Sequence, residues 1–294
     1  MVGARPAWEN TVDFAAWEPV VRASLFVGVF ALMAGWEALA PRRARLHSRW
    51  ARWPRNLGLV ALNTVVVRLI FPTAAVGFAA LAAQRGWGVL NVLELPYWVS
   101  FLVAVVALDF AIYLQHVMFH AVPLLWRLHR VHHADPDFDV TTGARFHPIE
   151  IVLSMLIKLA VVALLGAPAL AVLVFEVVLN ACAMFNHANV KLPAGVDRVL
   201  RWLIVTPDMH RIHHSELRAE ADSNYGFNLS WWDRVFGTYT PAARDPQEAM
   251  SIGVRGITGR PEAVTLGGML AMPFEGPRHP APSSAKPAKP AGLA

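Results

Sequence analysis

The sequence has little charge and almost no cysteine. Asp, Glu, Lys and Arg make up 16% of its 294 residues, against about 25% in an ordinary soluble domain. Because so few charged side chains could not cover the surface of a soluble protein, the composition indicates a membrane protein. It also excludes an intrinsically disordered chain. Cys182 is the single cysteine, which excludes an intramolecular disulfide and therefore a disulfide-stapled secreted fold.

Long apolar tracts are present instead. Four stand out, at residues 23–40, 57–83, 97–115 and 151–185, and a helix needs about 20 residues to cross the hydrocarbon core of a bilayer. The fourth tract is interrupted at Gly166-Ala167-Pro168, where the proline would end a helix, so it predicts a hairpin of two short spans. The sequence therefore predicts an all-α, multi-span integral-membrane helical bundle of about four to five spans.

The basic residues predict how these spans are oriented. The formal net charge is +5, and six arginines with no acidic residue among them separate the first two tracts: Arg42, Arg43, Arg45, Arg49, Arg52 and Arg55. Such a cluster marks a cytoplasmic loop rather than a nucleic-acid surface, and we expect no nucleic-acid partner. Counting spans from this loop brings His116 and His187 to the cytoplasmic face. Arg68, inside the second tract, is either a side chain that snorkels to the interface or a functional intramembrane charge.

Histidine is concentrated in one third of the chain. Ten of the 12 histidines lie between positions 116 and 214, and their spacing suits metal binding. An H-x-x-x-H pair places two imidazoles on one helical face, and each of two H-x-x-H-H boxes places three there. Two more histidines stand alone beside predicted helix ends. The candidate metal ligands are His116, His120, His129, His132, His133, His147, His187, His210, His213 and His214.

The number of candidate ligands predicts two metal ions. Burying so many imidazoles without a metal would leave unsatisfied polar groups, each costing about 1–3 kcal/mol. A structural zinc ion is closed by four ligands and a catalytic one usually by three, so this set is too large for one ion. Imidazole binds Fe, Cu, Zn and Ni alike, so the spacing alone does not choose the metal. Both the Glu-x-x-His pattern of soluble di-iron bundles and the H-E-x-x-H motif of zinc proteases are absent.

In order and spacing, these residues resemble the fatty acid hydroxylase/sterol desaturase superfamily of integral-membrane di-iron oxygenases. The first family element, Asp-x-x-x-Tyr-x-x-His-x-x-x-His, is matched by Asp109, Tyr113, His116 and His120. The second, Trp-x-x-His-x-x-His-His, is matched by Trp126, His129, His132 and His133.

The resemblance continues through residue 239. The later matching segments are Arg145-Phe-His147-Pro148-Ile-Glu150, Phe185-Asn-His187-Ala-Asn189, Thr206-Pro207-Asp208-Met-His210-Arg-Ile-His213-His214, Asp222-Ser-Asn224-Tyr225-Gly226 and Trp232-Asp233-Arg234-Val-Phe236-Gly237-Thr238. One departure is Val117, where many relatives carry arginine after the first histidine. The departure concerns a contact around the ligand rather than the ligand itself.

The resemblance implies O2 activation at two iron ions, for which zinc can substitute, on a membrane lipid. It also implies a set of residues that surround and orient the ligands: Asp109, Tyr113, Glu150, Asp208, Asn224 and Asp233. A separate electron-donor protein is expected, because the chain has no H-P-G-G motif of a fused cytochrome b5. For the loop segments that contain Asn224 and Asp233, simple packing and a direct role toward the substrate both stay open.

These observations predict a lipid hydroxylase or desaturase, and the alternative is a membrane protein for metal transport or storage. We expect membrane anchor helices at residues 1–96, a catalytic domain at 97–240 with a cytoplasmic histidine-rich helical cap, and an extension at 241–294. The extension is expected to be disordered from about residue 276, where Pro, Ala, Lys and Ser dominate. The preference for Arg over Lys and the abundance of Ala suggest a bacterial cytoplasmic membrane.

Overall fold

The computed structural model describes residues 12–93 and 95–276. The predicted disordered tail lies outside these residues. Within them, all regular structure is helical, and β pairing is limited to three isolated bridges. The expected all-α class is therefore confirmed.

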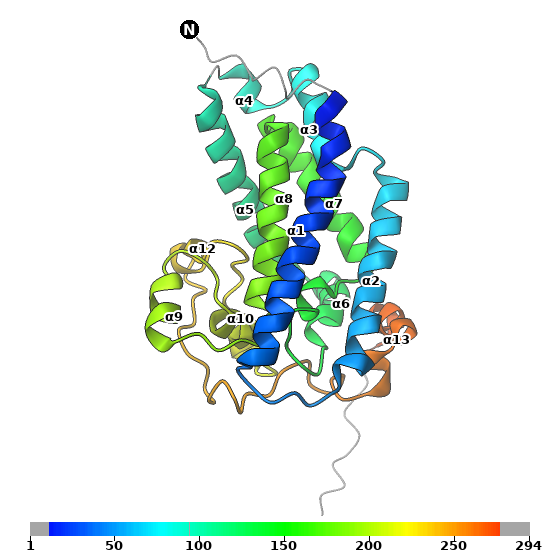
Figure 1. Cartoon of the computed structure of the whole chain (residues 1–294), viewed down its shortest axis with the longest axis vertical. Helices are drawn as coiled ribbons and strands as arrows, with labels where there is room; N and C mark the ends of the chain where they lie inside the picture. Colours follow the sequence, from blue (N-terminus) through cyan, green and yellow to red (C-terminus); the bar gives the residue numbers. More distant parts are fainter. Residues whose placement is uncertain (1–11, 94, 277–294) are drawn as a thin grey trace, which may run out of the picture.

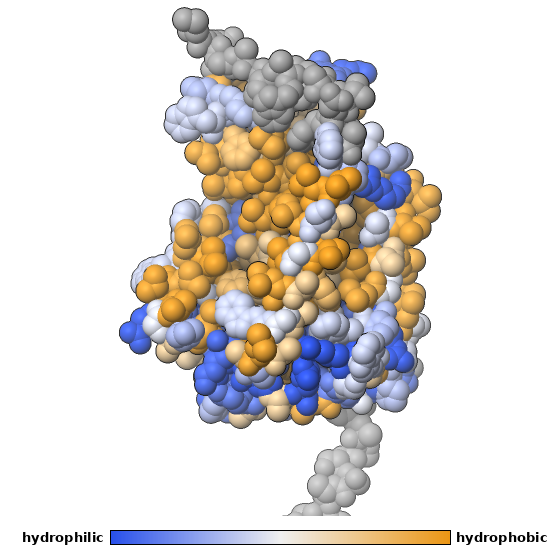
Figure 2. All heavy atoms as spheres, viewed as in Figure 1, coloured by the Kyte–Doolittle hydropathy of each residue, from blue (hydrophilic) through white to orange (hydrophobic). Residues whose placement is uncertain are grey.

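Five segments of the described chain are long and apolar enough to cross a membrane: Trp17–Leu39, Arg49–Val92, Tyr97–Ala121, Pro148–Leu165 and Ala169–Asn186. The helices that build them are α1 (Val12–Leu39), α2 (Arg49–Ile70), α3 (Ala74–Gln84), α4 (Val89–Val92), α5 (Tyr97–Ala121), α7 (Pro148–Leu165) and α8 (Ala169–Asn186). The long ones run side by side along the long axis of the molecule (Figure 1). Apolar residues cover the middle of the visible face, and hydrophilic ones gather at its lower end (Figure 2). The number of spans agrees with the sequence prediction.

The predicted hairpin break has a steric cause. Helix α7 ends at Leu165 and is capped by Gly166, whose φ of 68° lies in the left-handed region. A Cβ atom there would come within 2.4 Å of the carbonyl oxygen of Trp87, so only glycine fits. Pro168 then precedes the first residue of α8, where its missing N–H costs no helical hydrogen bond.

The second apolar tract, predicted as a span over residues 57–83, is not one continuous helix. It forms two helices, because Pro72 interrupts the helical hydrogen bonding between α2 and α3. Helix α2 also begins earlier, at Arg49, where the Ser48 hydroxyl caps the N–H of Trp50. Part of the arginine-rich segment is therefore helical rather than a loop.

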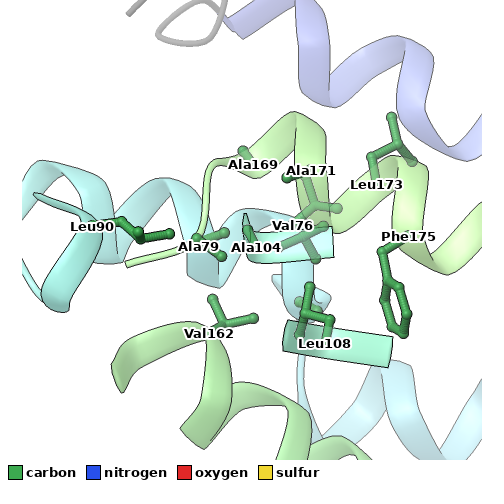
Figure 3. Packing of buried hydrophobic residues seen from close by; sticks show 13 residues of the cluster. Val76, Ala79, Leu90, Ala104, Leu108, Val162, Ala169, Ala171, Leu173 and Phe175 are labelled. Carbon is green, nitrogen blue, oxygen red and sulfur yellow. The ribbon is translucent and has the colours of Figure 1, made fainter. Parts of the chain in front are cut away.

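The core of the membrane bundle lies around α8. This helix packs against α1, α3 and α5, while α7 packs against α2, α3 and α5. Many of the buried contact residues are alanines, such as Ala79, Ala104 and Ala171 (Figure 3). Small side chains allow the helix backbones to approach closely, which is how helices associate in a lipid environment.

Short helices form a cap at one end of this bundle (Figure 1). They are α6 (Pro123–His133), η2 (Thr142–Ala144), α9 (Ala194–Leu200), α10 (Pro207–His213), α11 (Arg218–Ala221), α12 (Trp231–Val235), η3 (Pro261–Val264), α13 (Leu266–Ala271) and η4 (Met272–Phe274). Since α6 directly follows α5 and α10 packs against α8, the cap is joined firmly to the membrane helices.

Candidate metal centre

The histidines converge in two groups at the junction of the bundle and the cap. One group consists of His116, His120, His129, His133 and His213, and the other of His132, His187, His210 and His214. All nine side chains are buried, and within each group the selected ligand atoms lie within 4.8 Å of one another. Two nitrogens bound to one ion at about 2.1 Å each are at most about 4.2 Å apart, so the spacing is close to that of a bound metal.

A tight turn between α5 and α6 assembles the first group. Helix α5 ends at Ala121, Val122 takes an extended conformation, and Pro123 starts α6. The Nε2 atom of His116 thereby comes within 3.2 Å of Nε2 of His129. The Nε2 atoms of His120 and His133 are 3.1 Å apart. Proline at the first helical position fits this turn because its N–H would lack a helical partner in any case.

The hydrogen bonds of the outer ring nitrogens show that the first group fits a cation. Nδ1 of His116 donates to the carbonyl oxygen of Tyr225 at 2.8 Å, and Nδ1 of His129 donates to Oε1 of Glu150 at 2.6 Å. With Nδ1 protonated in each neutral ring, both Nε2 atoms carry only a lone pair. Two lone pairs facing each other at 3.2 Å repel, and a metal ion between them would convert the repulsion into ligation.

The hydrogen bonds of the second group show that it also fits a cation. Nδ1 of His187 donates to the carbonyl oxygen of Ala183 at 2.8 Å, which leaves its Nε2 as an acceptor. That atom lies 3.1 Å from Nε2 of His132 and 3.0 Å from Nε2 of His210. In His214, neither ring nitrogen has a hydrogen-bond partner among the described residues. Buried polar atoms without partners are rare in native proteins, and a bound metal would satisfy them.

Burial also keeps these rings in the form that binds metals. It lowers the pKa of His129 to about 3 and that of His187 to about 3, because a charged imidazolium is poorly solvated in the interior. Burial lowers the pKa of His132, His213 and His214 as well. The imidazoles are therefore neutral at physiological pH, as metal ligands must be.

The two groups are direct neighbours. The ring of His133, in the first group, stacks on that of His214, in the second, with centroids 4.3 Å apart. The rings of His129 and His132 are 5.2 Å apart across the same boundary. This arrangement suits two adjacent metal ions rather than two distant sites.

With this geometry established, the comparison with known proteins decides the family. The fatty acid hydroxylase family model matches residues 101–238, a range that contains all nine clustered histidines. Residues 101–238 thus form a domain similar to the fatty acid hydroxylase family. The resemblance predicted from the histidine boxes is thus confirmed. No solved structure matches the chain.

Several curated relatives are similar in sequence to this chain. Ornithine lipid hydroxylase OlsE of Rhizobium tropici is 32% identical over 179 residues, which cover 61% of this chain and 51% of the relative. Alkylglycerol monooxygenase of Xenopus tropicalis is 30% identical over 63% of this chain and 41% of the relative. Very-long-chain aldehyde decarbonylase GL1-1 of Oryza sativa subsp. indica is 31% identical over 63% of this chain and 31% of the relative. The aligned part thus spans about half or less of these proteins.

One predicted ligand, His147, lies in neither group of the domain. Its Nδ1 accepts a hydrogen bond from the N–H of Ile149 at 3.2 Å and caps the start of α7. Its Nε2 donates to the carbonyl oxygen of Leu270 at 3.2 Å. Both ring nitrogens are thus hydrogen-bonded, and His147 caps α7 in this structure.

Of Asp109, Glu150 and Asp208, which were predicted to orient ligands, Glu150 alone contacts a histidine. Asp109 accepts a hydrogen bond from the indole N–H of Trp232 at 2.8 Å. Asp208 pairs with Arg42 and Arg211. These two acids therefore hold the loops around the metal centre rather than its imidazoles.

The other three residues expected around the ligands act on the loop at residues 222–240. Asp233 accepts hydrogen bonds from the N–H of Tyr225 at 2.7 Å and of Gly226 at 2.8 Å, and burial raises the pKa of Asp233 to about 6. Asn224, with φ at 52°, donates to the carbonyl oxygen of Met209. The hydroxyl of Tyr113 bonds that of Thr238 at 3.0 Å. Together they fix the Tyr225 carbonyl, which in turn orients His116.

Sequence reasoning missed two features of the site. The first is the use of backbone carbonyls to orient imidazoles, since His213 also donates from Nδ1 to the carbonyl oxygen of Ser223 at 2.7 Å. Carbonyl oxygens occur at every residue, so no residue pattern could have revealed them. The second is Phe146, whose ring stacks on His132 at 4.4 Å between centroids. Its position next to a conspicuous His-Pro pair was the one available hint.

Arg52 has a structural role that its place in the arginine cluster did not predict. Its fully buried guanidinium donates to Asp135 at 2.7 Å and to Asp139 at 2.6 Å. The neighbouring positive charge lowers the pKa of Asp135 to about 2 despite its burial. These ion pairs attach α2 to the segment that directly follows the second histidine box.

A cavity of about 400 Å³ lies inside the bundle, next to this centre. Its inner end is lined by Phe146 and Glu150, which contact the ligands His132 and His129 respectively. Its walls come from α1, α2, α5, α7 and α8. A lipid chain in the cavity would be separated from the histidines by the side chains of Phe146 and Glu150.

Proposed function

We propose that the protein is a membrane lipid oxygenase. It would use O2 and electrons from a separate donor protein to hydroxylate, or desaturate, an unactivated C–H position of a lipid such as a sterol or fatty acyl chain. For hydroxylation the balance is R–H + O2 + 2 e⁻ + 2 H⁺ → R–OH + H2O. The observation that supports this most directly is the pair of buried histidine groups beside a cavity that enters the membrane bundle.

The nine clustered histidines would hold two iron ions, and zinc could take their place. Iron bound there would supply the activation of O2. The protein's own part is to present neutral imidazoles in fixed orientations. The carbonyls of Ala183, Ser223 and Tyr225 and the carboxylate of Glu150 each hold an Nδ1 proton, which aims Nε2 at the metal.

The relatives support lipid oxidation as the reaction class. Their names describe a hydroxylase acting on ornithine lipid, a monooxygenase acting on alkylglycerol and a decarbonylase acting on very-long-chain aldehyde. All three substrates combine a polar group with an apolar chain, which is the chemistry that a cavity inside a membrane bundle would accept.

The positive-inside pattern supports a cytoplasmic position for the metal centre. We propose a bacterial cytoplasmic membrane as the location, in line with the composition and with the relative from Rhizobium tropici. The alternative, metal transport, would need ligands spaced along a path through the bundle. The clustering of the histidines at one end of the described helices favours catalysis instead.

The proposal is tested by expressing the protein with a redox partner and profiling the extracted lipids for a new hydroxylated or unsaturated species. His132→Ala and His213→Ala should abolish the product while membrane insertion is retained. His47→Ala is the matched control, because that half-exposed histidine lies outside both groups. Product formation at the wild-type rate in both ligand variants would overturn the assignment.

A further inference from the structure

The cavity has a second, charged end that the proposed chemistry does not use. Far from the histidines it is lined by Arg22, Lys158 and Glu176, together with Glu18 and Arg68. All five residues belong to segments long and apolar enough to cross a membrane. Charged side chains are costly there and are commonly tied to function.

These charges form a connected network. One carboxylate oxygen of Glu176 accepts from Lys158 at 2.5 Å, and the other accepts from Arg22 at 2.5 Å. Arg22 also pairs with Glu18 one helical turn away. The network joins α1, α7 and α8 at the level where the cavity ends.

Helical spacing fixes the distance between the two ends. On α7, Glu150, Ser154 and Lys158 follow one another at steps of four and all line the cavity, so they share one face. With a rise of about 1.5 Å per residue, Lys158 lies about 12 Å from Glu150 along the helix. Glu176 lies about 16 Å before His187 on α8 by the same measure.

The charged end carries an excess of positive charge. Three cations, Arg22, Arg68 and Lys158, face two anions, Glu18 and Glu176. The remaining lining carboxylate, Glu150, belongs to the opposite end, where it bonds His129. Both oxygens of Glu176 are already used, whereas Lys158 makes a single hydrogen bond and Arg68 makes none within the described chain. Arg68 is also exposed on α2, so this end reaches the outer surface of the bundle.

We propose that the charged end of the cavity binds the anionic group of the lipid substrate, a carboxylate or a phosphate, through Lys158 and Arg68. Its apolar chain then extends along the cavity toward the histidines, and the carbon that reacts is remote from the anionic group. This inference rests on the proposed function, because it assigns the cavity to the substrate. An entirely apolar substrate would leave the excess positive charge without a counter-ion.

The test is direct binding to the metal-loaded protein in non-ionic detergent, without O2 or a reductant. Radiolabelled palmitate probes the carboxylate, and methyl palmitate is its neutral counterpart. Lysophosphatidate and monoacylglycerol form the matching pair for phosphate. The wild type should bind at least one anionic probe about 10-fold or more tightly than its neutral counterpart, the factor expected for one hydrogen bond to a charged group.

Lys158→Gln and Arg68→Gln should reduce this preference, and Lys158→Arg should restore it. The matched control is Arg85→Gln, an exposed arginine outside the cavity, which should keep the full preference. Selectivity for palmitate would identify a carboxylate, and selectivity for lysophosphatidate alone would identify a phosphate. Equal binding of charged and neutral probes by the wild type, or equal weakening of both by the variants, would mean that the charges only stabilise the bundle and would overturn the proposal.

Failure of this binding test can be distinguished from failure of the proposed function. If the wild type oxidises a lipid but shows no preference for anionic probes, this inference fails and the oxygenase proposal stands. If the preference is present and no lipid is ever oxidised, the oxygenase proposal fails and the anion site stands.

Discussion

The carboxylate of Glu150 offers a sensitive test of how the protein prepares its histidines. Its Oε1 accepts the Nδ1 proton of His129 at 2.6 Å. Its Oε2 is buried without a hydrogen-bond partner among the described residues. With a metal ion bound, an ionised Glu150 carboxylate would act mainly on one imidazole and would make Nε2 of His129 a stronger donor toward that ion.

Glu150→Gln would keep the shape of the side chain and remove its charge. The amide oxygen could still accept from Nδ1, but its NH2 group would occupy the position of an oxygen that has no partner. Loss of such an outer contact typically weakens metal binding by about 10–100-fold, which corresponds to about 1.4–2.7 kcal/mol. All nine clustered imidazoles stay in place in this variant, so a reduced metal affinity would report orientation and basicity alone.

The assay is anaerobic competition for ferrous iron between the protein and a coloured chelator. Asp208→Asn is the control, because Asp208 pairs with Arg42 and Arg211 and contacts no histidine; its iron affinity should match the wild type even if its melting temperature falls. Unchanged iron affinity in Glu150→Gln, or an equal loss in both variants, would show that the Glu150 carboxylate does not strengthen metal binding through His129.

Three further predictions concern His147, Arg52 and the effect of pH on the metal-free protein. His147→Asn should retain the helix cap and the full iron content, whereas His132→Asn should lose iron. Equal iron losses in the two variants, measured by elemental analysis, would show that His147 is a ligand. Arg52→Met should lower the free energy of unfolding by about 3–5 kcal/mol, because Asp135 and Asp139 lose their buried partner; a loss below about 1 kcal/mol in chemical denaturation would contradict this. Metal-free protein should lose stability as the pH falls below about 6.5, because the unfolded chain takes up protons that His129, with its pKa lowered to about 3, does not. The slope is about 1.4 kcal/mol per pH unit for each such histidine, and a melting temperature that is constant between pH 7.5 and 5.5 would contradict it.

The sequence predicted most of the bundle, because the bilayer imposes simple rules on helix length. The break at Gly166-Ala167-Pro168 was also predictable, because glycine and proline act locally on the backbone. The helix boundaries of the second tract were harder to predict. Pro72 splits it, and α2 begins eight residues before the tract, because its first turns are held by contacts with the cap rather than by lipid.

For the metal centre, the histidine boxes were readable because i, i+3 and i+4 spacing on a helix fixes a common face. The division into two groups was not, since it depends on how α5, α6, α8 and α10 pack. His147 was included because a histidine before proline can be either a ligand or a helix cap, and in the structure it lies in neither group. Arg52 was read as an orientation signal, although its partners Asp135 and Asp139 lie more than 80 residues away and became visible only in the fold.

We propose that the two histidine groups bind two iron ions for oxidation of a lipid. The most direct test is metal content per chain, measured by elemental mass spectrometry on detergent-purified protein after anaerobic reconstitution with ferrous iron. The reconstituted wild type should bind about two irons per chain, and His132→Asn and His213→Asn should lose iron. A reconstituted wild-type protein that binds no iron would contradict the proposal.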